Sequence, residues 1–222
     1  MVMTVTPETE VAIVYPESDG KPMAENTLQF RWIITIQGGF DAFYRDDPTV
    51  FVAGDLLWYP VEGRPDIRQA PDTMIVFGRP KGYRGAYIQH REGGIAPQVV
   101  FEVLSPGNTP REMTRKLSFY QHYGVEEYYV YDPQLGTLDG WVRQEHSLAE
   151  IEQIQGWVSP RTGVRFALDG LDLLLTRPDG RRFQSYLELD QARAEAETAR
   201  AEAEARAARL AERLRAAGIE PE

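Results

Sequence analysis

Two acidic residues and one lysine are the groups in this 222-residue chain best suited to chemistry. Asp72 lies in APDTMIVFG and Glu102 in PQVVFEVLSPGN, so each acid belongs to an apolar run typical of a buried strand. Lys116 follows in PREMTRKLSFYQHYG, a segment typical of a helix. A carboxylate is costly to bury unless it has a partner. Two such carboxylates with a lysine nearby are the groups that a Mg²⁺-dependent phosphodiesterase needs.

The ligand preferences of magnesium suggest how these residues would act. Mg²⁺ takes oxygen ligands, commonly one or two carboxylates together with water and phosphate oxygens. We expect Asp72 and Glu102 to supply the carboxylates, and the backbone carbonyl of Val103 to share the ion. The ion would neutralise phosphate charge and acidify a bound water. A lysine beside it would orient that water or stabilise the transition state. The expected cofactor is Mg²⁺, with Mn²⁺ able to replace it.

The segments before Glu102 predict one helix and several strands. Residues 23–44 have apolar side chains at helical spacing, and the Gly38-Gly39 pair is expected to end that helix. Residues 49–63 and 72–78 are rich in β-branched and aromatic residues and predict strands. Residues 78–96 form a long Gly-rich loop, and loops of this length are usually functional or mobile. We expect this loop to close over the substrate.

The segments after Glu102 predict a parallel crossover followed by hairpins. Thr109 as N-cap, Pro110 at the first helical position and Glu112 in a capping box begin a helix that ends near Gly124. The strand, helix, strand order favours a right-handed parallel connection. Short strands in residues 136–177 are expected to form antiparallel hairpins that extend one side of the sheet. The predicted fold class is α/β with a mixed central sheet.

The C-terminal segment has a different composition. It is rich in Ala, Glu and Arg without Gly or Pro until Gly218, which predicts a long helix. A heptad seam of small and apolar residues is spaced 4-3-4-3 and consists of Ala203, Ala207, Leu210, Leu214 and Ala217. Two interpretations stay open. The helix could pair with its copy in a homodimer, or it could be a single helix that is solvated or packs on its own domain.

Composition excludes several classes of site. The chain has no cysteine, which rules out disulfides, thiolate zinc sites and a cysteine nucleophile. Its three histidines lack metal-ligand spacing. The first twenty residues have no long apolar region, and no stretch approaches the ~18 apolar residues of a membrane span. We expect a soluble cytoplasmic protein with no membrane partner.

The net charge of −10 limits how the chain could bind nucleic acid. Residues 187–222 hold nine acids and six arginines, so they contribute −3 and residues 1–186 keep −7. A basic footprint is usual for nonspecific binding, so any DNA-binding surface must be local or must rely on metal ions. The candidate basic groups are Arg79, Lys81, Arg84 and Arg91, then Arg111, Arg115 and Lys116. For the first cluster a solvated loop is an equally good interpretation.

The order Pro71-Asp72, a long gap, Glu102 and then a lysine is similar to the PD-(D/E)XK nuclease superfamily. EVLSPGN, followed by a lysine and YGVEEYYVYDP, resembles the Uma family (Uma-two) of restriction-endonuclease-like proteins, once a domain of unknown function, over roughly residues 20–180. The resemblance implies a restriction-endonuclease-like mixed sheet flanked by helices. It also implies Mg²⁺-dependent hydrolysis of DNA, in which water attacks in line and leaves a 5′-phosphate.

The resemblance divides the chain into three parts. Residues 1–20 would be an extended N-terminal segment, residues 21–184 the endonuclease-like domain, and residues 185–222 a C-terminal helix able to form a coiled coil.

One departure from the superfamily pattern concerns the lysine. The Glu-x-Lys pattern would place lysine two residues after Glu102, where this chain has Leu104. The resemblance implies that the lysine has moved to the following helix, where Lys116 lies. Glu112 lies four residues earlier on the same helical face, where the family tends to carry an acid.

Two more acids are secondary candidates. Superfamily members often place an acid on the first helix, and Glu25 occupies such a place. Asp55 lies on the predicted strand before Asp72 and could be a further metal ligand, although such a residue often only ends a strand.

Three functions remain open, because fold does not fix function. The first is a metal-dependent DNA endonuclease. The second is a nucleic-acid-binding or assembly module on the same fold without turnover, which the acidic charge and Leu104 favour. The third is a structural partner protein whose function resides in its C-terminal coiled coil.

Overall fold

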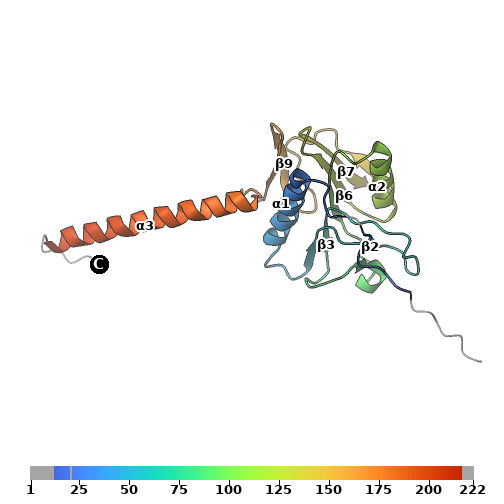
Figure 1. The fold of residues 1–222 in the computed structure, drawn as a ribbon, viewed down its shortest axis with the longest axis horizontal. Coiled ribbons are helices and arrows are strands. Elements are labelled where there is room, and N and C mark those ends of the chain that lie inside the picture. The colour runs from blue at the N-terminus through green and yellow to red at the C-terminus, as the bar shows by residue number, and fades with distance from the viewer. Residues whose placement is uncertain (1–12, 21, 217–222) are drawn as a thin grey trace, which may run out of the picture. The chain divides into compact units, whose positions relative to one another are not determined.

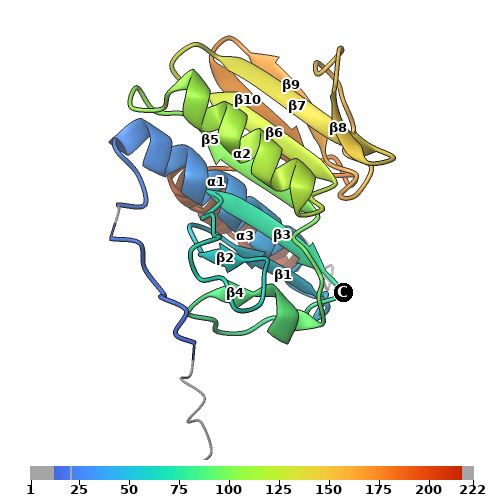
Figure 2. The same ribbon diagram turned by 90° about the vertical axis from the view of Figure 1, so that its right-hand side faces the viewer.

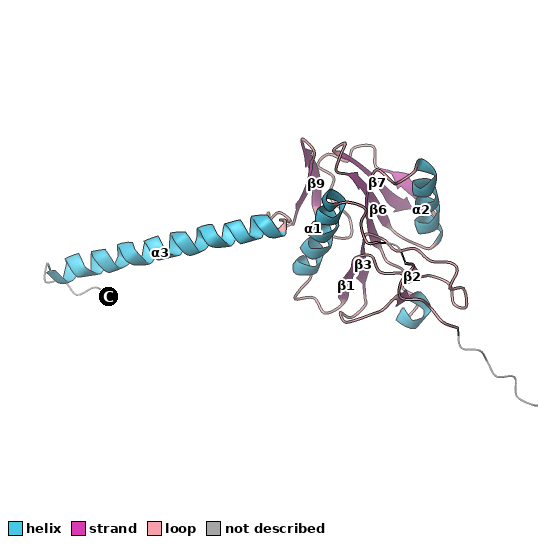
Figure 3. Cartoon of the chain, viewed as in Figure 1, coloured by secondary structure: helices cyan, strands magenta, loops and turns pink. Residues whose placement is uncertain are grey.

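The computed structural model describes residues 13–20 and 22–216. The chain divides into two compact units between Phe183 and Gln184. The first unit contains helices α1 (Thr27–Phe43) and α2 (Pro110–His122), the 3₁₀ turn η1 (Gln89–Glu92), and the strands β1 (Val50–Ala53), β2 (Trp58–Tyr59), β3 (Thr73–Phe77), β4 (Tyr87–Ile88), β5 (Val99–Val103), β6 (Glu127–Asp132), β7 (Thr137–Gln144), β8 (Ser147–Glu150), β9 (Arg165–Asp169) and β10 (Asp172–Thr176). The second unit contains helix α3 (Tyr186–Ala216). Figure 1 labels these elements, and Figure 3 distinguishes helices from strands.

A six-stranded mixed sheet in the order β1-β3-β5-β6-β7-β8 forms the centre of the first unit. Strands β5 and β6 are parallel and are joined through α2, as the strand, helix, strand order predicted, while the other neighbours are antiparallel. In the pairing of β3 with β5, Thr73 lies opposite Phe101. One step further along this register, Asp72 comes beside Glu102. The predicted α/β class with a mixed sheet is confirmed.

Helices α1 and α2 cover opposite faces of the sheet (Figure 1). The buried side of α1 packs Ile36 and Phe40 against the core that contains Phe101. On the other face α2 lies along the strands (Figure 2), where Tyr120 joins the core that contains Val100. Each helix therefore packs against strand β5 from its own side of the sheet.

Helix α2 begins and ends as its sequence predicted. Thr109 is the N-cap, and its hydroxyl accepts a hydrogen bond from the N–H of Glu112. Pro110 occupies the first turn, where its missing N–H costs nothing. The chain leaves the helix at Gly124, whose φ of +92° is a conformation that favours glycine.

The prediction that Gly38-Gly39 ends the first helix is wrong, because α1 continues to Phe43. The two glycines differ in their surroundings. A Cβ at Gly38 would have open space, whereas one at Gly39 would overlap the ring of Phe183. Gly39 is thus needed so that Phe183, which also contacts Phe40, can lie against the helix.

The single strand predicted over residues 49–63 is divided into β1 and β2. The interruption falls at Gly54 and Asp55, and Asp55 adopts a left-handed conformation with φ +48°. Its N–H donates to the carbonyl of Pro71. Left-handed backbone is uncommon for residues other than glycine, although aspartate tolerates it better than most. The turn brings Asp55 close to the start of β3.

The predicted hairpins extend the sheet only in part. Strands β7 and β8 continue the main sheet beyond β6, but β9 and β10 form a separate two-stranded sheet that packs into the core on the α1 side. Within the segment 136–177 that was expected to form hairpins, residues 151–164 are mostly irregular. The buried carboxylate of Glu127 holds the following turn, because it accepts hydrogen bonds from the Ser159 hydroxyl and the Arg161 N–H.

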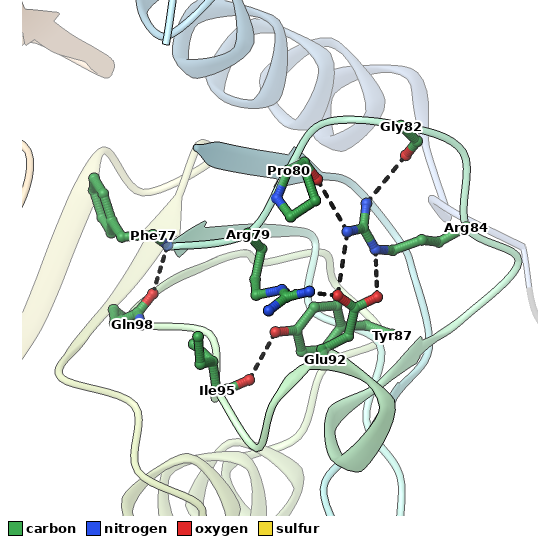
Figure 4. Close-up of polar contacts among 9 residues, drawn as sticks. All are labelled: Phe77, Arg79, Pro80, Gly82, Arg84, Tyr87, Glu92, Ile95 and Gln98. Carbon is green, nitrogen blue, oxygen red and sulfur yellow. Dashed lines mark hydrogen bonds and ion pairs between the residues drawn. The ribbon is translucent and has the colours of Figure 1, made fainter. Parts of the chain in front are cut away.

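The long loop over residues 78–96 has internal structure, as Figure 4 shows. Arg79 and Arg84 both form ion pairs with Glu92, at 2.9 and 2.6 Å. The hydroxyl of buried Tyr87 donates to the carbonyl of Ile95. Two members of the first basic cluster are therefore used to hold this loop together.

Helix α3 has no buried residue in its described length. Its surface carries ion pairs at i,i+4 spacing, between Arg193 and Glu197 and between Arg200 and Glu204. Residues 1–12, Lys21, Ala217 and Gly218 lie outside the described residues, so part of the predicted N-terminal segment and the last seam position are not observed. Pairing of α3 with a copy stays a prediction. Within residues 13–20 and 22–216, no helix is long and apolar enough to cross a membrane.

The contrast between the two α1 glycines gives a first prediction. Gly38→Ala should stabilise the protein by about 0.5–1 kcal/mol, because alanine is the better helix former and meets open space. Gly39→Ala should instead destabilise it by roughly 1–3 kcal/mol, because Phe183 must move. Urea denaturation of both variants measures the difference, and equal effects would show that the Phe183 contact does not constrain the helix.

Candidate active site

The two carboxylates expected to act together lie side by side where β3 begins and the antiparallel strand β5 ends. Glu102 is 1% exposed and Asp72 9%. Asp72 precedes the first residue of β3, and its Oδ2 accepts a hydrogen bond of 2.7 Å from the N–H of Val103. This bond ties the Asp72 side chain across the sheet to the strand that carries Glu102.

Lys116 reaches Glu102 from helix α2. Its Nζ donates to Glu102 Oε2 at 2.8 Å, and both side chains are largely buried. Glu112, which lies four residues earlier on the same helical face, acts on Lys116 only through its charge. Burial by itself would lower the pKa of the Lys116 ammonium, but the carboxylates of Glu102 and Asp72 outweigh it and raise that pKa. Lys116 is therefore a cation in this arrangement and not a neutral base.

Tyr120 also contacts Glu102 and is a site residue that the sequence analysis does not name. Its hydroxyl donates to Glu102 Oε1 in a short hydrogen bond. Burial and the Glu102 charge raise the pKa of Tyr120 well above its usual value, so it remains a donor. The spacing of four from Lys116 could have indicated it, because residues four apart on a helix share a face.

The other side of the site is formed by the beginning of α1. Gln29 Nε2 donates to the Val103 carbonyl at 2.8 Å, and Gln29 Oε1 accepts the N–H of Glu25. The Glu25 carboxylate accepts hydrogen bonds from the Ser105 hydroxyl and from the Gly107 N–H. Glu25 thus supports the turn after β5, and Gln29 is a site residue that sequence reasoning missed.

These groups open into a cleft of about 730 Å³. Its acidic lining residues are Asp19, Glu25, Asp55, Asp72 and Glu112, and its basic ones are Arg115 and Lys116. All three secondary candidates therefore line the same cleft as Asp72 and Lys116, whereas Glu102 and Val103 are not among its lining residues. Among the lining residues that the structure describes, five acids stand against two bases, before buried Glu102 is counted.

The pKa of two carboxyl groups reflects this crowding. Burial raises the pKa of Asp72 well above its usual range, and the neighbouring Glu102 carboxylate raises it further. Burial also raises the pKa of Asp55, with Asp19 and Glu102 adding to the effect. Carboxylates gathered this closely oppose ionisation unless a cation balances them.

The donor set suits a hard cation such as Mg²⁺, although it does not form a closed cage. Among residues 13–20 and 22–216, no group of three or more His, Asp or Glu side chains is arranged to hold a metal. Mg²⁺ usually needs only one or two carboxylates, because water and phosphate oxygens complete its coordination. Asp72, Glu102 and the Val103 carbonyl fit this pattern. That carbonyl has one lone pair left besides the one used by Gln29.

The loop expected to close over substrate lies elsewhere. None of residues 78–96 lines the cleft, and the loop is held by its own ion pairs (Figure 4). Gln121, on the same helix as Lys116, accepts a hydrogen bond from the N–H of Leu148 at strand β8 through its side-chain oxygen. Leu104, where Glu-x-Lys would place lysine, packs against the core on the α2 side.

Comparison with known proteins supports one identification. Residues 20–184 match the family Uma2, described as "Putative restriction endonuclease", and the chain belongs to this family. One solved structure that matches the chain is titled a putative nuclease belonging to DUF820, from Anabaena variabilis. It shares 16% sequence identity with this chain, covers 70% of this chain and 84% of its own, and gives a TM-score of 0.45. No curated protein matches the chain.

The raised pKa of Asp72 gives a second prediction. The pKa of Asp72 is higher in the folded protein than in the unfolded chain. At a pH between these two pKa values the folded protein therefore binds more protons than the unfolded chain. The free energy of unfolding consequently falls as the pH rises from the lower pKa to the higher one. Asp72→Asn should therefore stabilise the metal-free protein at pH 7 by on the order of 1 kcal/mol, with little gain near pH 4. Urea denaturation at both pH values measures this, and an equal gain at both would contradict the assignment.

Two buried tyrosines give a third, matched prediction. Tyr120→Phe removes the donor to Glu102 and should cost roughly 1.5–3 kcal/mol, as for a hydrogen bond to a charged group. Tyr128→Phe should be nearly neutral, because the buried Tyr128 hydroxyl has no hydrogen-bond partner in the described structure. Denaturation of both variants tests this, and a similar loss for each would mean that the Glu102 contact contributes little.

Proposed function

We propose that this protein is a divalent-metal-dependent endonuclease. It hydrolyses DNA phosphodiester bonds in the cleft that Asp72 and Lys116 line. The observation that carries the proposal is the pairing of two buried carboxylates with one buried lysine at a cleft wall. Asp72 and Glu102 adjoin, Lys116 donates to Glu102, and the cleft leaves room for a phosphate group. Membership of the Uma2 family supports the assignment.

The charge of the cleft supports the dependence on metal. Five of the described lining residues are acidic, against Arg115 and Lys116, and these acids would oppose the approach of a polyanion. Asp72, Glu102 and the Val103 carbonyl would hold Mg²⁺ or Mn²⁺. Once bound, such an ion neutralises phosphate charge and acidifies a coordinated water.

The chain's own residues have distinct parts in the proposed reaction. The Val103 N–H orients the Asp72 carboxylate. Lys116 keeps its proton, so its ammonium would orient the attacking water or stabilise charge on the scissile phosphate as an electrostatic group. Tyr120 orients Glu102 through Oε1. Gln29 holds the Val103 carbonyl in place.

A second function remains as an alternative: a nucleic-acid-binding or assembly module that has lost turnover. The observation that favours it is Leu104, at the position where the superfamily pattern has its lysine, together with the net charge of −10. Such a module would bind DNA with salt-dependent affinity and would not cleave it.

Plasmid cleavage provides the fourth prediction. With Mg²⁺ or Mn²⁺ the wild-type protein should nick supercoiled DNA, and Lys116→Ala should lower the rate by about 10²–10³-fold. Asp72→Asn should lose both cleavage and the heat of Mn²⁺ binding. Lys81→Ala is the matched control, because Lys81 pairs with Asp41 outside the cleft and its loss should leave the rate unchanged.

Calorimetry and DNA binding separate the alternatives. If no metal binds at millimolar concentration, the carboxylates are structural and the nuclease proposal is wrong. If metal and DNA bind but no cleavage occurs, the protein is the binding module. If Lys116→Ala cleaves as well as Lys81→Ala does, the assignment of the displaced lysine fails.

A further inference from the structure

Helix α3 presents an exposed seam that its own unit does not cover. Tyr186, Leu187, Leu189 and Leu210 are all more than half exposed. Positions spaced alternately by three and four residues follow one face of the helix, the arrangement of a coiled-coil seam. These seam positions are Tyr186, Leu189, Arg193, Ala196, Arg200, Ala203, Ala207, Leu210 and Leu214. Two arginines therefore stand among apolar and small residues, and Leu187 lies on the opposite face.

The two ends of α3 carry opposite charge. The first twelve residues, 186–197, hold four acids and one arginine, a net charge of −3. The last eleven described residues, 206–216, hold four arginines and one acid, a net charge of +3. The acidic end cannot form ion pairs with the basic end of the same straight helix. About 13 Å of helix separates Glu197 from Arg206, at 1.5 Å per residue.

We propose that two copies of this chain pair through α3 in antiparallel orientation. In this orientation the acidic end of each helix lies along the basic end of the other. Leu189 of one copy meets Leu214 of the second copy, and the same contact recurs by symmetry at the other end. A two-fold axis would pass between residues 201 and 202, which gives the closed, isologous interface usual for homodimers.

Arg193 is the seam arginine that separates the two orientations. In a parallel pair Arg193 would face its own copy, which places like charges together in the interface. In the antiparallel register Arg193 faces Leu210 and lies about 26 Å along the axis from its copy. Arg200 faces Ala203 and lies near its own copy in either orientation, so it does not distinguish them. The small residue leaves room for the arginine stem, and each guanidinium can keep its i,i+4 partner, Glu197 or Glu204.

The absence of cysteine makes the orientation directly testable in the full-length protein. Leu189→Cys and Leu214→Cys are prepared separately, mixed and oxidised. The antiparallel pair predicts a disulfide-linked dimer in the mixture and almost none with either variant alone, because a residue and its own copy would lie roughly 37 Å apart. Crosslinking of each variant alone would instead establish a parallel pair and overturn the proposal.

Sedimentation equilibrium tests whether the pair exists, with a matched leucine on the same helix as control. Leu214→Asp should weaken self-association by at least about tenfold, as expected for a charge placed in a seam. Leu187→Asp should leave it unchanged, because Leu187 lies off the seam. Circular dichroism verifies that α3 stays helical in both variants. A wild-type protein of one-chain mass at 100 μM, or equal losses in both variants, would overturn the proposal. The outcome is independent of the nuclease assay.

Discussion

The site depends on an imbalance of buried charge at the end of strands β3 and β5. Two carboxylates, Asp72 and Glu102, share one ammonium group from Lys116. Burying ions is expensive, and breaking such a set leaves an uncompensated charge. Hydrogen bonds from Val103 and Tyr120 reduce this cost, but they add no positive charge. The raised pKa of Asp72 means that a proton can balance the second carboxylate, and the proposed metal ion would take the place of that proton.

The elements around Asp72 and Glu102 bring the groups that contact these two carboxyl groups together. The antiparallel register of β3 with β5 brings the two acids together. The parallel crossover from β5 to β6 lays α2 over the same strands, so Lys116 and Tyr120 reach the two oxygens of Glu102 from one helical face. Helix α1 approaches from the other side of the sheet and holds the strand end through Gln29. Three segments distant in sequence thus converge on one strand end.

A second buried glutamate shows that burial alone does not make such a site. Glu127 is 1% exposed on strand β6, yet its oxygens accept hydrogen bonds from Ser159, Tyr129 and the Arg161 N–H. These donors are neutral and belong to the chain itself, so the carboxylate fastens one turn to the sheet. Glu102 differs because its partners include the ammonium group of Lys116 and the buried carboxyl group of Asp72.

The sequence by itself determined the strands of Asp72 and Glu102, helix α2 with its caps, the parallel crossover and the family. These features depend on local patterns such as apolar runs, Thr109 before Pro110, and a glycine that ends a helix. Only the tertiary structure decided that Lys116 pairs with Glu102, that Tyr120 and Gln29 belong to the site, and that the 78–96 loop does not. It also decided that α1 passes through Gly39, where Phe183 fills the space of a side chain. The physical reason is that each of these outcomes depends on a partner far away in sequence, which no local pattern identifies.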